Sequence, residues 1–111
     1  MSIFVFGSNL AGRHGKGAAL EAMRRGAKYG QAFGLQGRTY AIPTKSARLQ
    51  PLPIEAIARF VAQFIEFAKA NPQLEFEVTR VGCGLAGHTD EEMSALFRAA
   101  PENCHLPKGW R

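Results

Sequence analysis

Apolar residues along the chain fall into four short strand-like segments. Residues 3–6 are all apolar, which is typical of a strand buried on both faces of a parallel sheet. Residues 39–42 are strand formers that we expect Pro43 to end, because proline cannot donate to a central ladder. Residues 76–81 alternate apolar and polar positions, as a strand nearer a sheet edge does, and residues 104–106 predict a short last strand.

Three segments between these strands have helical patterns. Residues 18–25 are helix formers that stop before a glycine. A longer helix starts at Pro53 and has one apolar face, which consists of Ile54, Ile57, Ala58, Val61, Phe64, Ile65 and Ala68. A third helix stops at Pro101, and either Thr89 or Asp90 can cap its start.

Residues 26–38 lie between the first helix and the second strand. Glycines recur every three or four residues in this segment, and Tyr29, Phe33 and Leu35 stand between them. Interleaved aromatic residues predict a structured loop that packs onto the rest of the molecule. A flexible low-complexity segment is the alternative.

Strands and helices therefore follow one another in the order β-loop-α-β-α-β-α-β. With short right-handed crossovers, this order predicts the α/β class, with a mainly parallel sheet between two helical layers. Nothing in the 111 residues has the composition of a long linker, so we expect one domain over residues 1–111. A compact three-layer α-β-α domain is the predicted fold.

Lysine and arginine residues outnumber acidic residues by 14 to 9, which gives the chain a net charge of +5. The excess lies in residues 1–50, where Glu21 is the one acidic residue. Such a charge creates a field that attracts anions. A solvated basic surface is the other interpretation.

Several classes of protein do not fit the sequence. It begins with a strand pattern rather than a signal segment, and no apolar run is long enough to span a membrane. The two cysteines, Cys83 and Cys104, lack metal-type spacing, and neither His14 nor His88 has a second ligand nearby. We expect a cytoplasmic protein with free thiols, without a metal or cofactor, that does not bind membranes.

Glycine-rich or polar loops follow the predicted strands. Ser8 and Asn9 follow the first strand, Thr44 and Lys45 follow the second, and residues 82–87 follow the third. Because the carboxyl ends of parallel strands share one edge of the sheet, the three loops should meet at one crevice. Glycine lets backbone N–H groups approach a ligand, and two of the loops lead into helices, so the pattern predicts that a diphosphate binds there.

The common nucleotide-binding fingerprints do not match the first loop. Residues 12–17 read GRHGKG, which is not G-x-G-x-x-G. Gly17 also stands where a phosphate loop needs Ser or Thr to bind magnesium. The spacing therefore excludes both fingerprints.

Over most of its length the sequence resembles the macro domains, which are ADP-ribose-binding and ADP-ribose-processing modules. The loop that encloses the distal ribose in that family resembles Ser8, Asn9, Gly15, Gly17 and Ala18. The loop that wraps the diphosphate resembles Gly82, Cys83, Gly84, Leu85, Ala86 and Gly87. The family usually has six strands, so the four predicted here imply that peripheral strands are lost or unrecognised.

Within this family the sequence is most similar to the branch of terminal ADP-ribose glycohydrolase and of antitoxins that remove ADP-ribose from DNA, and to short bacterial and phage proteins. Thr44 and Lys45 resemble a threonine-lysine pair of that branch. The resemblance implies that Lys45 is the catalytic lysine, close to the anomeric carbon of the distal ribose; an anion contact and a plain surface lysine are the alternatives. Where the glycohydrolase has an aspartate, this chain has Ala86, and Asp90 either reaches inward in its place or caps the helix.

Other side chains near the loops have two interpretations each. Asn9 caps a turn or binds ribose, and the two loop histidines face solvent or act as proton donors or phosphate contacts. Trp110 docks the C-terminus or packs in an oligomer contact. The aromatic side chains that offer adenine a stacking surface are Tyr29, Phe33 and Tyr40, and core packing is the main expectation for Tyr40.

Three functions fit these patterns. The first is binding of ADP-ribose or an ADP-ribosylated substrate, with hydrolysis of the ADP-ribosyl linkage on nucleic acid, protein or a small nucleotide. The second is a binding or sequestering module without turnover, which Ala86 favours. The third is binding of nucleic acid through the basic first half. The sequence leaves the oligomeric state open.

Overall fold

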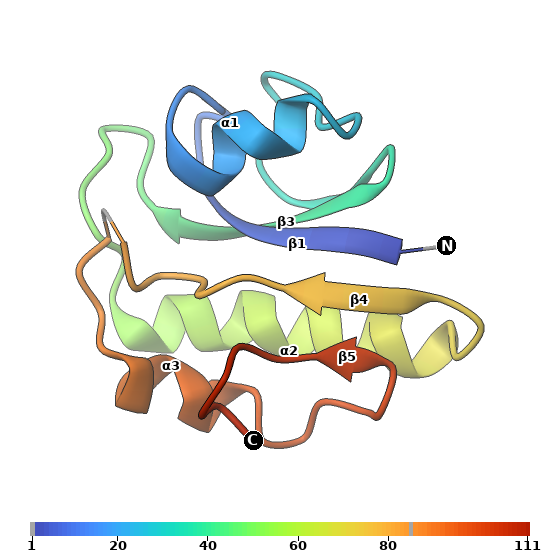
Figure 1. Cartoon of the computed structure of the whole chain (residues 1–111). Coiled ribbons are helices and arrows are strands. Elements are labelled where there is room, and N and C mark those ends of the chain that lie inside the picture. Colours follow the sequence, from blue (N-terminus) through green and yellow to red (C-terminus); the bar gives the residue numbers. More distant parts are fainter. Residues whose placement is uncertain (1, 85) are drawn as a thin grey trace.

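A five-stranded sheet with the strand order β2-β3-β1-β4-β5 forms the centre of the molecule (Figure 1). The structure is a computed structural model, which describes residues 2–84 and 86–111. In chain order the elements are β1 (Ser2–Asn9), α1 (Gly17–Met23), β2 (Gly34–Gln36), β3 (Thr39–Lys45), α2 (Ile54–Ala70), β4 (Glu75–Val78), α3 (Asp90–Leu96) and β5 (Cys104–His105).

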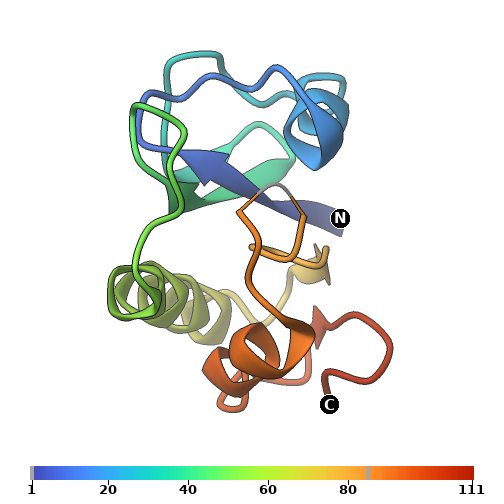
Figure 2. The ribbon, with the colours of Figure 1, turned by 90° about the vertical axis from the view of Figure 1, so that its left-hand side faces the viewer.

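Four of the strands are parallel, and helices cover both faces of the sheet. β1 pairs in parallel with β3 and β4, β4 pairs in parallel with β5, and only β2 runs antiparallel to its neighbour. Helix α1 lies on one face, and α2 and α3 lie on the other (Figures 1 and 2). The predicted α/β class, with a mainly parallel sheet between two helical layers, is therefore confirmed.

Residues 3–6 of β1 are all apolar because this part of the strand divides two hydrophobic cores. Ile3 and Val5 point into the larger core under α2 and α3, whereas Phe4 and Phe6 point into a smaller core under α1. Phe64 of α2 lies at the centre of the larger core. Its ring centroid is 5.1 Å from that of Tyr40, 5.3 Å from Phe76 and 6.2 Å from Phe97.

β3 runs on to Lys45, so the prediction that Pro43 ends this strand is wrong. Ser8 pairs with Pro43 in the parallel ladder with β1. On its other edge β3 pairs with β2 only at residues 39–41. Because the carbonyl of Arg38 accepts from the N–H of Phe4 in β1, alternation along the strand turns the nitrogen of Pro43 toward the other edge. Among the described residues, that edge has no partner strand at Pro43, so the missing N–H breaks no ladder bond.

Residues 26–38 contain a strand, β2, that the sequence analysis did not predict. The segment is ordered by the buried amide of Gln36, which accepts a hydrogen bond from the N–H of Lys28 and donates one to the carbonyl of Gln31. The aromatic residues contribute less than predicted, because Tyr29 and Phe33 are 64% and 53% exposed. A short strand with glycines on both sides carries too few apolar positions to show a period.

β4 ends at Val78, three residues earlier than predicted. Its alternation arises because Phe76 and Val78 face the larger core, while Glu75 and Glu77 stay exposed on the opposite face. Beyond the strand, the N–H and hydroxyl groups of Thr79 both donate to the carbonyl of Val5, which holds the following loop against β1. Because β4 pairs with β1 on one edge and with β5 on the other, it lies inside the sheet although one of its faces is open to solvent.

Of the three helices, α2 keeps its predicted limits, whereas α1 ends at Met23 rather than Arg25 and α3 ends at Leu96, well before Pro101. α2 begins after Pro53, and it buries Ile57, Val61, Phe64, Ile65 and Ala68 of its predicted apolar face. Among the helices described here, none is both long and apolar enough to cross a lipid bilayer. Cys83 and Cys104 are both free thiols.

Candidate functional site

A cleft of about 780 Å³ lies at the carboxyl ends of β1, β3 and β4. The chain leaves β1 toward α1 on one face of the sheet, and it leaves β3 and β4 toward the helices on the other face, which opens a crevice between the loops. These three loops face the viewer in Figure 2. The described residues that line the cleft are Gly7, Arg13, Gly15, Lys16, Gly17, Ala18, Ala19, Tyr29, Thr44, Lys45, Leu49, Thr79, Arg80, Val81, Gly82, Cys83, Gly84 and Ala86.

The loop after β1 is braced by the side chains of Ser8 and Asn9. The amide of Asn9 accepts a hydrogen bond of 3.0 Å from the N–H of Arg13 and donates one of 2.9 Å to the carbonyl of the same residue. The hydroxyl of Ser8 donates to the carbonyl of Ala32. Both residues are buried, and neither is among the described residues that line the cleft. Their observed contacts shape the loop.

The same loop is joined to residues 28–32 by a second set of contacts. The N–H of Gly30 donates to the carbonyl of Gly12 at 2.8 Å, and Nε2 of His14 lies 3.1 Å from the carbonyl oxygen of Gln31. Gly12 has a φ of +69°, and a Cβ atom there would lie 2.4 Å from the carbonyl carbon of Gly30. Only glycine allows this close approach of the two backbones.

Neither loop histidine faces solvent, so that interpretation of them is wrong. His14 is buried and packs edge-on against Phe6 at 5.2 Å. His88 is largely buried, and its Nε2 lies 3.1 Å from the carbonyl oxygen of Leu52. Neither imidazole is among the described residues of the cleft wall. Each of them packs one loop against another segment of the chain.

The glycine-rich loop after β4 lines the cleft with Gly82, Cys83, Gly84 and Ala86, whereas Gly87 does not line it. The predicted contact Leu85 lies outside the described residues. Gly82 has a φ of +79°, and a Cβ atom at this position would lie 2.9 Å from the sulfur of Met93. Among the described residues, the N–H groups of Gly82, Gly84 and Ala86 donate no backbone hydrogen bond.

The loop after β3 adds Thr44, Lys45 and Leu49 to the cleft. Thr44 is buried, and its hydroxyl donates to the carbonyl of Ser8 at 3.3 Å, so it ties β3 to β1. Lys45 is half-buried at the end of β3, and no carboxylate of the described residues lies within 4 Å of its ammonium. Leu49 is the described non-glycine residue with a positive φ, +63°, and it is 46% exposed at the rim.

The charges of the cleft wall are all positive. Its ionised side chains are Arg13, Lys16, Lys45 and Arg80, and no aspartate or glutamate of the described residues lines the cleft. Charges of one sign around a concave surface attract ligands of the opposite sign. The cleft is therefore suited to an anion.

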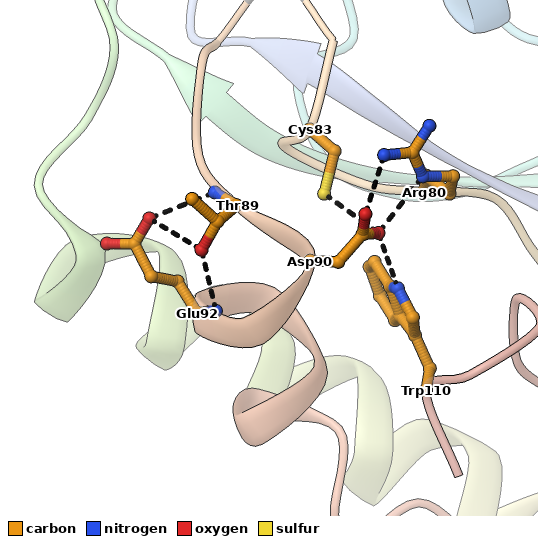
Figure 3. A network of polar contacts seen from close by, with 6 residues as sticks. All are labelled: Arg80, Cys83, Thr89, Asp90, Glu92 and Trp110. Carbon is orange, nitrogen blue, oxygen red and sulfur yellow. Dashed lines mark hydrogen bonds and ion pairs between the residues drawn. The ribbon is translucent and has the colours of Figure 1, made fainter.

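Asp90 is not the cap of α3, which corrects one of its two interpretations. The cap is Thr89, whose hydroxyl accepts from the N–H of Glu92 in a capping box. The carboxylate of Asp90 instead accepts hydrogen bonds from Arg80, Cys83 and Trp110 (Figure 3). The bonds from Arg80 and Trp110 hold the pKa of Asp90 at about 2.

Cys83 and Trp110 complete this network. Burial, followed by the neighbouring Asp90 carboxylate, raises the pKa of the Cys83 thiol, so the thiol stays protonated at neutral pH. Trp110 is 5% exposed and packs against Phe97, with ring centroids 5.4 Å apart. Trp110 therefore docks the C-terminus onto α3.

Of the three aromatic candidates for base stacking, only Tyr29 lines the cleft. Phe33 packs against Phe60 at 5.9 Å, and Tyr40 is buried in the larger core as expected. Arg13, Thr79 and Arg80 also line the cleft and are not among the predicted site residues. The position of Arg80 could have indicated its place in the cleft, since it follows a strand at the carboxyl edge where the other loops meet.

No protein-family model and no curated protein matches the sequence. Three solved structures share its fold. A protein of unknown function from Bacteroides thetaiotaomicron superposes with a TM-score of 0.64 at 17% identity, over 96% of this chain and 86% of that chain. A second structure from this bacterium has a TM-score of 0.62 at 16% identity, over 95% of this chain and 87% of the other. A macrodomain protein from Streptomyces coelicolor has a TM-score of 0.62 at 18% identity, over 97% and 88% of the two chains. At these identities the similarity establishes a macrodomain-like fold.

Proposed function

We propose that the cleft binds ADP-ribose or a closely related nucleotide diphosphate. The observation that carries this proposal is a cleft whose ionised side chains are all cations, at the carboxyl edge of a macrodomain-like sheet. Its volume of about 780 Å³ lies within the range of roughly 300–1,000 Å³ that small-molecule sites occupy. An anionic ligand of nucleotide size fits both the charge and the volume.

In this proposal the two glycine-rich loops hold the diphosphate. Backbone N–H groups of Gly15, Gly17 and Ala18 approach it from one side, and those of Gly82, Gly84 and Ala86 approach it from the other. Thr44, Cys83 and the remaining residues of the second loop, Leu85 and Gly87, complete the predicted set. Ser8 and Asn9 support binding by fixing the first loop, and Tyr29 offers the adenine ring a flat surface.

Calorimetric titration with ADP-ribose, AMP and NAD tests this proposal. We expect saturable binding of ADP-ribose that is tighter than that of AMP, because AMP lacks the diphosphate and the distal ribose. Lys16→Gln should weaken ADP-ribose binding severalfold, whereas Lys28→Gln, on the neighbouring surface outside the cleft, should not. Absence of saturable heat with ADP-ribose at millimolar concentration would overturn the proposal.

Hydrolysis of an ADP-ribosyl linkage is the second candidate function, and the position of Lys45 in the cleft favours it. A lysine amine can act as a nucleophile toward a sugar carbon. The cleft of the described residues lacks the carboxylate that would assist such a step, because Ala86 takes that position and Asp90 is bound by three side chains. Binding without turnover is therefore the simpler proposal.

Replacing Lys45 by alanine separates these two functions. If the protein is a hydrolase, Lys45→Ala should abolish release of ADP-ribose from modified protein and from a modified oligonucleotide while its affinity for ADP-ribose stays within a few fold. Lys108→Ala, at the C-terminal loop, is the matched control and should release product like the wild-type protein. Intact binding by the wild-type protein with no product over hours would assign it to the binding class.

A further inference from the structure

Arg80 lies two residues after the end of β4, in the wall of the cleft, and its side chain is 62% exposed. Its Nε atom donates to one oxygen of Asp90 at 3.0 Å, and its Nη2 atom donates to the other at 2.7 Å. Nη1 points away from the carboxylate in Figure 3. The pair with Asp90 thus fixes the plane of the guanidinium, and the N–H groups of its outer edge, on Nη1 and on the far side of Nη2, donate to no other described residue.

Asp90 is itself fixed from two directions. It is the first residue of α3, directly after the Thr89 cap, so its backbone position is set by the helix. Its carboxylate also accepts a 2.7 Å hydrogen bond from Nε1 of Trp110, whose ring is buried against Phe97. The docked C-terminus therefore holds the carboxylate that holds the guanidinium.

A role in stability alone does not account for this arrangement. An exposed ion pair contributes little to folding because both partners are well solvated as separate ions. Its geometric effect is larger, since a guanidinium held through two nitrogens cannot sweep through the rotamers that an exposed arginine otherwise visits. The arrangement therefore restricts one cation of the cleft wall to a single orientation.

We propose that Arg80 binds a phosphate of the ligand through its free guanidinium edge, and that Asp90 and Trp110 act as positioning residues for it. This inference rests on the proposed function for the identity of the nucleotide, but it requires only that the cleft receives a phosphate. Fork-shaped pairing of a guanidinium with phosphate oxygens is strong and directional. Arg80 would give the second glycine-rich loop a side-chain contact to the diphosphate beside its backbone N–H groups.

Calorimetric titration with ADP-ribose and with inorganic pyrophosphate tests the proposal. Arg80→Gln should weaken the binding of both by roughly 10-fold or more, as expected for a lost charge-assisted contact. Arg98→Gln, which removes the same charge from the exposed turn after α3, is the matched control and should bind like the wild-type protein.

Asp90→Asn gives the sharpest discrimination, because charge and position predict opposite results. Removal of a carboxylate near the cleft strengthens the binding of an anion by charge alone. Loss of positioning should instead weaken it by roughly 3- to 10-fold. Trp110→Phe keeps the ring against Phe97 but removes the N–H donor, so it should cause a smaller loss in the same direction. The double variant Arg80→Gln/Asp90→Asn should bind no more weakly than Arg80→Gln, since both changes remove one contact.

The results also separate this inference from the proposed function. Wild-type affinity in Arg80→Gln, tighter binding in Asp90→Asn, or additive losses in the double variant would each overturn the inference. Pyrophosphate binding that depends on Arg80 without any ADP-ribose binding would retain it and overturn the proposed function. Binding of neither probe to the wild-type protein would overturn both.

Discussion

Gly12→Ala is expected to weaken ADP-ribose binding by roughly 10-fold or more, a loss of at least about 1.4 kcal/mol of binding free energy. The new Cβ would lie 2.4 Å from the backbone of Gly30, where no flexible side chain can move aside. Residues 28–32 must then shift away from the loop after β1, which separates Tyr29 from Arg13 and Lys16 across the cleft. The change combines a left-handed φ with overpacking, so we also expect about 2–5 kcal/mol lower stability.

The matched control for this variant is Gly34→Ala. Gly34 also has a positive φ, +90°, but a Cβ atom there meets no atom within 4 Å. It should lose only the roughly 1–2 kcal/mol that a left-handed residue costs, and it should bind ADP-ribose like the wild-type protein. Denaturant unfolding and calorimetric titration measure the two effects, and equal loss of affinity in both variants would contradict the explanation.

Phe64→Ala is expected to lower the free energy of unfolding by about 3–5 kcal/mol. Phe64 is fully buried, and its ring packs against the rings of Tyr40 on β3 and Phe76 on β4, the two strands that flank β1. Truncation leaves a cavity at the point where α2 meets the sheet. Since domains of this kind have a total stability of roughly 5–15 kcal/mol, the loss should be visible as a large fall in the denaturation midpoint.

Phe33→Ala is the control for this change, because it removes the same atoms from the surface. Phe33 is 53% exposed, and its ring packs against that of the partly buried Phe60. We expect it to cost less than about 1 kcal/mol. A loss as large as that of Phe64→Ala would show that the segment carrying Phe33 is part of the folding core.

Local patterns predicted the parts of the fold that depend on burial. The all-apolar run of β1 and the apolar face of α2 are both visible in the sequence because each repeats over several positions. β2 could not be predicted because it spans three residues, which is too few to show a period. The prediction that Pro43 ends β3 applied a rule for strands that are paired on both edges, whereas β3 is paired with β2 over only part of its length. Both errors concern the side of β3 that carries a partner for only part of its length.

The candidate site was predictable only as far as topology places it. Parallel strands bring the loops after β1, β3 and β4 to one edge, so the glycines of two loops and Lys45 could be expected at one cleft. Side-chain directions could not, because they depend on contacts between distant segments. Asp90 and Thr89 are adjacent and chemically alike as caps, and the positions of Arg80 and Trp110, 10 and 20 residues away from Asp90, separate their roles.

The hydrogen-bonded contact between the loop after β1 and residues 28–32, called the joint below, affects the free energy of ligand binding. Hydrogen bonds from Ser8, His14 and Gly30 cross this joint, so one wall of the cleft is a doubled layer of backbone rather than a single loop. Such a wall has little freedom left to lose when a ligand arrives, and the entropic cost of binding falls accordingly. This side of the cleft is therefore preorganised, and the affinity for a ligand depends on the shape and charge that the free protein already has.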